Sequence, residues 1–445
     1  MISLHNRFYT NKDEFLMILL GTVIVFLLTS IGLYFFIRYA FVLGMVDKPN
    51  ARSMHTRIVP RGGGLVFVSI ALTAALIFSW VQGVLDLKRA LIYLAIAIVL
   101  WAGFVDDKKE VSPKIKFIYI FIAAAIACYS SICLTYLGSY LGHPVYLPIW
   151  LAAPFTFFAI AGFTNALNLM DGLDGLAGGL SVIMLGAFLW IGLNFHDDFM
   201  IITSAIFLAA ILAFLLYNWH PAKVFMGDSG SLTLGFVIAL LAIRAGTHVS
   251  PSSVLFILVL PIMDTFIVMT RRIQRGLSPF HADKTHMHHL LFNRYRDVSY
   301  TTIILLYIQL AFTLIGLQLT KTDDFLSIIL MGILFFIFLK LFDQRSVRRK
   351  PLKERAPHIR FIEKLRDDYL NPLQKQPAIY EELYGAAQKR ADTLLTPEKK
   401  IEIVMDIIRG KKGIDESAEE FDISVEIIEM WVKDARTGID QALRK

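Results

Sequence analysis

The chain has 445 residues, and its composition separates it from most soluble proteins. Apolar residues make up 56% and charged residues 18%, whereas typical globular domains have about 45–50% and about 25%. The mean hydropathy is +0.58, yet the formal net charge is +7. This combination excludes a set of soluble domains and predicts one polytopic membrane domain with a polar appendage.

Runs of about 17–25 apolar residues are long enough, as helices, to cross about 30 Å of hydrocarbon. Eleven such runs follow one another in the sequence. We expect them over 15–39, 64–82, 90–105, 115–137, 148–169, 176–194, 199–217, 231–247, 253–270, 301–319 and 325–342. The predicted fold is an all-α polytopic membrane protein with about eleven transmembrane helices and a small helical C-terminal domain.

Lys and Arg residues gather in alternate connections between the expected spans. The connections after the first, third, seventh and ninth spans carry most of them, whereas the others hold little beyond Lys88, Arg89 and Lys321. Short loops rich in Lys and Arg stay on the cytoplasmic side of a membrane. We therefore expect a multi-pass protein of the inner or plasma membrane, with its polar loops and its C-terminus in the cytoplasm.

Two cysteines, Cys128 and Cys133, lie five residues apart in an apolar run. Free cysteine is among the most buried residue types. We expect two packed thiols here, rather than a disulfide or a metal site.

The strongest polar signal is the segment 165–176, Asn-Ala-Leu-Asn-Leu-Met-Asp-Gly-Leu-Asp-Gly-Leu. Asn165, Asn168 and Asp171 are three residues apart, so at a helix end they project to one side. Converging oxygen ligands suit Mg²⁺, which binds carboxylate and carbonyl oxygens and keeps waters for a phosphate partner. A polar turn with Asn and Asp caps explains one or two of these residues, whereas the whole set predicts a metal–phosphate site.

A pair of carboxylates, Asp106 and Asp107, follows the third span directly and precedes Ser112-Pro113-Lys114. An ordinary solvated loop has a similar composition. Carboxylates at a membrane edge are costly, however, and are functional candidates by default. We therefore interpret the pair as part of the site.

A further acidic turn, 225–231, places Asp228 among glycines and serines just before the eighth span. Small neighbours let an anion approach backbone N–H groups. Asp228 or Ser229 as a helix N-cap is the alternative, and it is compatible with a metal–diphosphate role. The first basic loop adds Arg61 before the glycines 62–64. We expect Arg61 to bind substrate; the glycine cluster alone is weak evidence for phosphate binding, but it agrees with the other loops.

The longest basic loop ends with the segment 281–289, His-Ala-Asp-Lys-Thr-His-Met-His-His. Zinc is one interpretation of its histidines, but no cysteine accompanies them and the spacing is not that of structural zinc sites. Neutralisation of phosphates fits better, and a solvated basic loop is the remaining alternative. Together the loops predict phosphoryl transfer between a soluble phosphate compound and a partner in the bilayer.

Four motifs resemble those of the polyprenyl-phosphate N-acetylhexosamine-1-phosphate transferases, enzymes of the glycosyltransferase family 4 type. They are the Asp-Asp pair at 106–107 and the segments 165–176, 225–231 and 281–289. The motifs occur in the family's order, and the resemblance covers roughly residues 15–342. In that family a sugar-1-phosphate moves from a UDP-sugar to polyprenyl phosphate, and UMP is released. The resemblance implies the same reaction for this chain.

Functional positions carry over by motif. Asn168 and Asp228 match magnesium-binding positions, and Asp106, Asp107 and Asp171 match essential carboxylates, of which we take Asp106 as the base. Substrate-binding positions are matched by Asp174, Asn218 and Phe225 at the uracil end, and by Lys114, His286, His288 and His289 at the phosphates. The resemblance implies Mg²⁺ as cofactor, with Mn²⁺ as a substitute. It also implies a UDP-sugar donor, polyprenyl (undecaprenyl) phosphate as acceptor, membrane lipids as partners, and a homodimer as the state of many relatives.

The pattern His-x-His-His after Asp-Lys resembles the GlcNAc-type branch, whereas the branch that uses UDP-MurNAc-pentapeptide has three consecutive histidines. We therefore expect GlcNAc-1-phosphate transfer, as the first membrane step of a cell-envelope glycan. Phospho-MurNAc-pentapeptide transfer is the alternative within the family. A transporter of nucleotide- or lipid-linked sugars is the alternative from another class, and the few polar residues of the outer loops argue against it.

The sequence predicts three domains: a transferase domain over 1–342, a basic juxtamembrane linker over 343–394 and a helical module over 395–445. The linker begins with a basic cluster, 345–355, which either binds anionic headgroups or only flanks the last span.

The C-terminal module resembles the helix-turn-helix of transposase-like proteins. Thr396 precedes Pro397 as an N-cap would, and an apolar face follows over 401–408. From Ala391 onward there are 13 Asp and Glu residues against 9 Lys and Arg residues. Because neutralisation of phosphates dominates affinity for nucleic acids, we expect this module to bind protein or itself rather than DNA.

Overall fold

The computed structural model describes residues 12–47, 58–109, 111–278, 285–342 and 397–408, together with residues 417, 428, 431 and 432. The chain forms two compact units, Met1–Arg349 and Lys350–Lys445. The predicted boundaries at 342 and 394 stay predictions.

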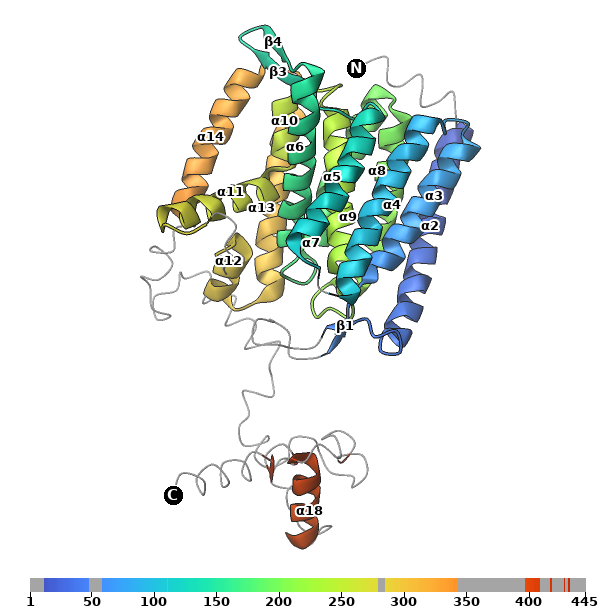
Figure 1. Ribbon diagram of the computed structural model, residues 1–445, viewed down its shortest axis with the longest axis vertical. Helices are drawn as coiled ribbons and strands as arrows, with labels where there is room; N and C mark the ends of the chain where they lie inside the picture. Colours follow the sequence, from blue (N-terminus) through green and yellow to red (C-terminus); the bar gives the residue numbers. More distant parts are fainter. Residues whose placement is uncertain are drawn as a thin grey trace. The chain divides into compact units, whose positions relative to one another are not determined.

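The first unit is a bundle of long apolar helices (Figure 1). They are α2 (Lys12–Tyr39), α3 (Gly63–Val81), α4 (Leu87–Lys108), α5 (Pro113–Tyr129), α6 (Ile149–Leu169), α7 (Leu176–Phe195), α8 (Asp198–Asn218), α9 (Gly227–Ala245), α10 (Pro251–Ile257), α11 (Val259–Gln274), α12 (Met287–Tyr295), α13 (Val298–Gln318) and α14 (Asp324–Leu341). Most of these bounds lie within a few residues of the expected spans, because the length of an apolar run largely determines a membrane-spanning helix.

Within the described residues, nine helices are long and apolar enough to cross a membrane, or ten if α10 and α11 form one bent span. The predicted all-α polytopic fold is confirmed. The count of eleven is not, because the expected run 115–137 is shorter than predicted. Its helix α5 has 17 residues and ends at Tyr129, and the strand β3 (Tyr136–Tyr140) begins before residue 137.

Two short antiparallel strand pairs lie at opposite ends of the bundle (Figure 1). β1 (Val46–Asp47) pairs with β2 (Val59–Pro60), and β3 pairs with β4 (His143–Tyr146). We call the two ends of the bundle the β1 end and the β3 end. The chain crosses between them, so α4 and α6 end at the β1 end, where α5 and α9 begin.

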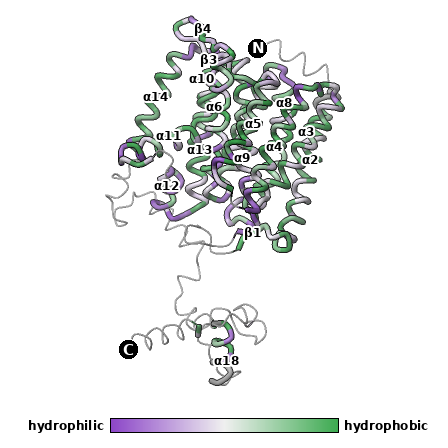
Figure 2. The backbone as a smooth tube through the Cα atoms, in the orientation of Figure 1, coloured by the Kyte–Doolittle hydropathy of each residue, from purple (hydrophilic) through white to green (hydrophobic). Residues whose placement is uncertain are grey.

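Helix α9 forms the centre of the bundle and packs against α3, α4, α6 and α7. In its most apolar window 89% of the residues are buried, against 17% in the peripheral helices α2 and α14. The hydropathy colours of Figure 2 show apolar helices with polar residues gathered toward the ends of the bundle. The N-terminus of the central helix therefore lies at the polar β1 end.

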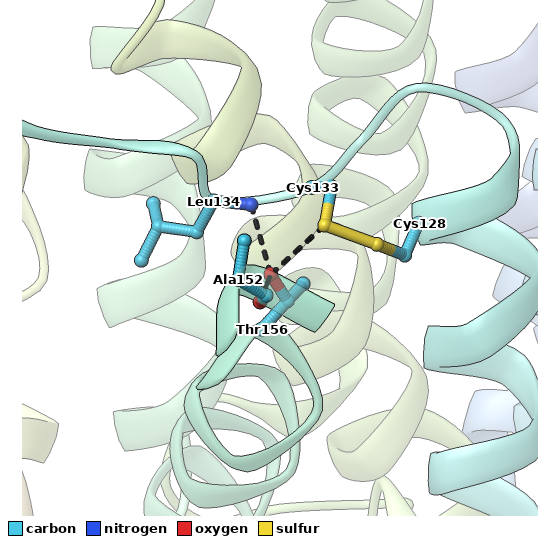
Figure 3. The surroundings of a disulfide bond; sticks show 5 residues. All are labelled: Cys128, Cys133, Leu134, Ala152 and Thr156. Atoms are coloured by element: carbon cyan, nitrogen blue, oxygen red, sulfur yellow. Dashed lines mark hydrogen bonds between the residues drawn. A yellow bond between two sulfur atoms is a disulfide. The ribbon is translucent and has the colours of Figure 1, made fainter. Parts of the chain in front are cut away.

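A disulfide joins Cys128 and Cys133, whose Cα atoms are 4.4 Å apart, so the prediction of two packed thiols is wrong. The reason is a reversal of the chain after α5. Ser131 takes a left-handed φ of 75°, which brings the two side chains together. Beside the disulfide, Thr156 Oγ1 of α6 accepts a hydrogen bond from Leu134 N at 2.8 Å and lies 3.5 Å from Cys133 Sγ (Figure 3). The disulfide and these contacts link the end of α5 to α6 toward the β3 end.

In the second unit, the helix α18 (Pro397–Ile408) coincides with the expected apolar face, and Ile403 and Val404 are buried. Thr396, the basic cluster 345–355 and most of residues 409–445 lie outside the described residues. The helix-turn-helix resemblance and the partner of this module stay predictions.

Candidate active site

Four carboxylates gather at the β1 end from three parts of the chain. Asp106 and Asp107 lie in the last turn of α4, Asp171 follows α6, and Asp228 lies in the first turn of α9. Because α4 and α6 both pack against α9, their ends converge on the start of the central helix. The three motifs that sequence analysis selected therefore meet in space.

Lys116 of α5 joins two of these carboxylates. Its Nζ lies 2.8 Å from Asp106 Oδ2 and 2.5 Å from Asp228 Oδ2. Asp106 Oδ1 accepts a second hydrogen bond from Val111 N at 2.8 Å. Lys114, the residue predicted from the sequence, is exposed on another face of the same helix and forms no ion pair with the described carboxylates. The bridging lysine is thus Lys116, and the predicted contact of Lys114 with phosphate stays a prediction.

The side chain of Asp107 is fully buried and caps α9. It accepts hydrogen bonds from Asp228 N at 2.8 Å and Ser229 N at 3.0 Å. Two of the free N–H groups at the start of α9 are satisfied in this way. Gly227 makes the close approach feasible: its φ is 72°, and an added Cβ would lie 2.6 Å from both Asp107 carboxylate oxygens. Asp107 therefore positions Asp228, which does not act as the N-cap itself.

Arg61 supplies the second cation of the cluster. Its Nε lies 3.1 Å from Asp107 Oδ1, and its Nη2 lies 3.4 Å from Asp228 Oδ1 and 4.0 Å from Asp106 Oδ2. Burial lowers the pKa of Arg61, but the charges of Asp107 and Asp228 raise it by more. The net pKa is raised, so the guanidinium stays charged. The N–H groups of the adjacent glycines 62–64 donate to the carbonyls of Phe225 and Met226, and a contact of this loop with phosphate stays a prediction.

Asn168 and Asp171 approach the cluster from α6. Asn168 Nδ2 donates to Ser231 Oγ at 2.8 Å, and its Oδ1 has no partner among the described residues. Asp171 is half-buried in the turn after α6. Burial, and then the negative charge of Asp228, raise the pKa of Asp171 to about 7. A carboxyl of this kind exchanges its proton near neutral pH.

The residues predicted to bind uracil tie two loops of the β1 end together. Asp174 Oδ2 lies 2.7 Å from His220 Nδ1 and accepts from Ala222 N at 3.1 Å. Asn218 accepts from Gly175 N at 3.0 Å, while its Nδ2 donates to the carbonyl of residue 224 at 2.8 Å. Phe225 N in turn donates to the carbonyl of residue 60 at 2.8 Å. These contacts hold the loops in place, and uracil binding stays a prediction.

The described part of the histidine motif, residues 285–289, is called the histidine segment. It lies against the turn that contains Asp171. His286 Nδ1 is 2.6 Å from Asp264 Oδ2, a buried carboxylate of α11. His288 Nε2 faces Gly172 so closely that a Cβ there would collide with the ring. Burial, then His289, lower the pKa of His288 to about 3, so this ring is neutral. Residues 281–284 of the motif lie outside the described residues.

The cluster suits a divalent cation that takes only one or two ligands from the protein. Among the described residues, no three His, Cys, Asp or Glu side chains are placed to hold a metal ion. Mg²⁺, however, often takes one or two carboxylates and completes its shell with water and substrate phosphates. The ammonium of Lys116 already shows that a cation contacts Asp106 and Asp228 together. The site therefore suits an ion that arrives with a phosphate.

Comparison with known proteins agrees with this geometry. The family model described as Glycosyl transferase family 4 matches residues 89–246. The probable undecaprenyl-phosphate N-acetylglucosaminyl 1-phosphate transferase of Bacillus subtilis is 33% identical over 308 residues, which are 68% of this chain and 85% of that protein. The undecaprenyl-phosphate alpha-N-acetylglucosaminyl 1-phosphate transferase of Yersinia pestis is 30% identical over 336 residues, 71% of this chain and 89% of that protein.

The Escherichia coli (strain K12) protein of the same name is 33% identical over 287 residues, 60% of this chain and 74% of that protein. The chain belongs to glycosyltransferase family 4. It is thus a multi-pass membrane enzyme of that family. The matched range 89–246 contains all four clustered carboxylates, whereas Arg61 and the histidines lie on either side of it.

Two residues of this family 4 enzyme were missed by sequence analysis. Lys116 had no motif of its own, and only the packing of α5 shows that it, rather than Lys114, bridges the carboxylates. Asp264 did carry a signal, because a carboxylate inside an apolar run is costly unless it has a partner. That partner is His286.

Proposed function

We propose that this enzyme transfers GlcNAc-1-phosphate from UDP-GlcNAc to undecaprenyl phosphate. An oxygen of the lipid phosphate bonds to the phosphorus that carries the sugar, and the bond from that phosphorus to UMP breaks. The products are undecaprenyl diphosphate GlcNAc and UMP. The observation that carries the proposal is the cluster of four carboxylates, one lysine and one arginine at one end of the bundle, in a chain whose relatives bear this activity in their names.

The charges of the cluster suit this reaction. Arg61 and Lys116 are cations placed among the carboxylates, where they can also neutralise the phosphates of two anionic substrates. Asp106 is our choice for the group that orients or deprotonates the lipid phosphate, because Asp107 is occupied as the cap of α9. Asp171 adds a carboxyl whose proton exchanges near pH 7.

We further propose that the enzyme depends on Mg²⁺, or Mn²⁺ in its place. Asp228 and Asn168 would hold the ion, with Asp106 beside them. The bound ion would neutralise charge that develops on the diphosphate. Asn168 supports this proposal because its Oδ1 has no partner among the described residues, while its Nδ2 is fixed by Ser231.

We place the enzyme in the inner or plasma membrane, with the β1 end on the cytoplasmic side. The asymmetry of Lys and Arg in the loops supports this orientation. The disulfide between Cys128 and Cys133 supports it independently, because disulfides persist in oxidising compartments and this one lies toward the β3 end. The soluble donor would then reach Asp106 and Asp228 from the side on which UDP-sugars are made.

The proposed reaction is tested by measuring UMP release from the purified full chain in lipid nanodiscs. We expect release only when UDP-GlcNAc, undecaprenyl phosphate and Mg²⁺ are all present, and UDP-MurNAc-pentapeptide should not replace UDP-GlcNAc. Asp228→Asn should abolish release while the protein stays folded. Uptake of UDP-GlcNAc into sealed vesicles without product would favour the transporter instead, and release from the pentapeptide donor would overturn the choice of sugar.

A further inference from the structure

The span formed by α10 and α11 is broken, with an angle of 81° between its halves. A break inside a membrane domain leaves backbone groups that need partners. Gln309 of α13, which is fully buried, supplies them. Its Oε1 accepts from Leu260 N at 3.2 Å, and its Nε2 donates to the carbonyl of Ile257 at 2.7 Å and to Thr313 Oγ1 at 2.9 Å. One side chain therefore fixes the bend.

Beyond the bend, α11 runs across the bundle instead of along it (Figure 1). This direction brings Asp264 to the histidine segment. Asp264 Oδ1 accepts from Met287 N at 2.6 Å, and Oδ2 lies 2.6 Å from His286 Nδ1. Arg271, further along α11, donates to the carbonyl of Thr285 at 2.9 Å. Three consecutive residues, 285–287, are thus held from one helix.

These contacts determine which atoms of the histidines remain for a substrate. His286 turns Nδ1 toward Asp264, so Nε2 is its second polar atom. The ring of His286 stacks on His288, with 5.7 Å between the centroids and 18° between the planes. His288 itself packs against Gly172, next to Asp171. The distance between the histidine segment and the carboxylate cluster therefore depends on where α11 holds residue 286.

The geometry points to Asp264 as a positioning residue, which acts through His286 to present the imidazole Nε2 to the diphosphate of the sugar-nucleotide donor. The inference rests on the proposed function and adds the residue that orients one of its phosphate contacts. Among the described residues, Asp264 of α11 contacts Nδ1 of His286, and His288 of the same segment stacks on its ring.

A double-mutant cycle tests the inference, with UMP release measured in nanodiscs. We expect Asp264→Asn and His286→Ala each to lower kcat/KM for UDP-GlcNAc by about 10- to 100-fold. The double variant should be no worse than His286→Ala alone, because Asp264 acts only through that ring. Asp264→Glu keeps the charge and should recover part of the loss.

The matched control is Asp197→Asn, which breaks a comparable pair toward the β3 end, where Asp197 Oδ2 lies 2.8 Å from His248 Nε2. It should lower thermal stability and leave kcat/KM for UDP-GlcNAc unchanged. Losses that multiply in the double variant, or no recovery of activity in Asp264→Glu, would show that Asp264 is only structural. Failure of both Asp264 variants to fold would lead to the same conclusion. If wild-type protein releases no UMP, the proposed function fails instead.

Discussion

The ammonium of Lys116 lies between the carboxylates of Asp106 and Asp228, 2.8 Å from the first and 2.5 Å from the second. Three helices, α4, α5 and α9, thereby share one charge at the β1 end. Without it, two carboxylates would face each other beside the expected position of two phosphates, and like charges at short range repel. We therefore expect the lysine to be needed both for the cluster and for its anionic substrates.

We predict that Lys116→Met lowers the rate of UMP release by about 100-fold or more, the scale seen when one charge-stabilising donor is removed from an active site. The loss of rate in Lys114→Met should be at least tenfold smaller, because that side chain is exposed and forms no ion pair with the described carboxylates. Initial rates at saturating donor check both. Equal losses in the two variants would contradict the bridging role.

Asp106 and Asp107 are adjacent, but we predict that removing Asp107 lowers stability, whereas removing Asp106 mainly lowers activity. Asp107→Ala leaves the N–H groups of Asp228 and Ser229 without their cap, which costs about 1 kcal/mol or more for a buried cap. The melting temperature should fall by several degrees. Asp106→Ala should melt within about one or two degrees of wild type, yet release almost no UMP. Thermal unfolding in detergent, with activity on the same samples, separates the two roles.

Much of this architecture could be read from the sequence, because the length and position of an apolar run determine most of a membrane helix. The end of α5 and the break between α10 and α11 were not predicted. The convergence of the motifs was also predictable, since alternate loops must meet at one end of a bundle. The bridge formed by Lys116 was not, because it depends on which face of α5 packs inward. The disulfide depends on the reversal at Ser131, which neighbouring residues do not specify.

We predict that Gly172→Ala reduces activity by about tenfold or more, since a Cβ at this position would collide with His288 and displace the turn that carries Asp171. His288→Ala in the same chain should restore part of the loss by removing the ring. Gly162→Ala is the control, because its Cβ would have no neighbour within 4 Å. A fully active Gly172→Ala enzyme would show that the turn and the histidine are not tightly packed in the working protein.

The orientation of the bundle leads to a labelling prediction. In a Cys128→Ser variant, Cys133 is a single thiol toward the β3 end and should react with a membrane-impermeant maleimide in intact spheroplasts. Lys109→Cys, in a chain without other cysteines, places the thiol at the β1 end, where residue 109 is exposed. It should react only after permeabilisation. The reverse pattern would invert the proposed topology.

The last prediction concerns Asp171, whose pKa burial and the charge of Asp228 raise to about 7. In the unfolded chain an aspartate titrates near about 3.9, so the folded state binds the proton more tightly. The resulting stability is fully present below about pH 4 and is lost as the pH rises toward 7.

Asp171→Asn stays neutral, and at pH 8 it should be more stable than wild type by on the order of 1–2 kcal/mol after allowance for solvent screening. The gain should be a few degrees in melting temperature at pH 8 and clearly smaller at pH 5. The same variant should release almost no UMP. A side chain that lowers stability at working pH and is needed for turnover is retained for chemistry rather than for folding. An active Asp171→Asn enzyme, or one with no gain at pH 8, would remove Asp171 from the site.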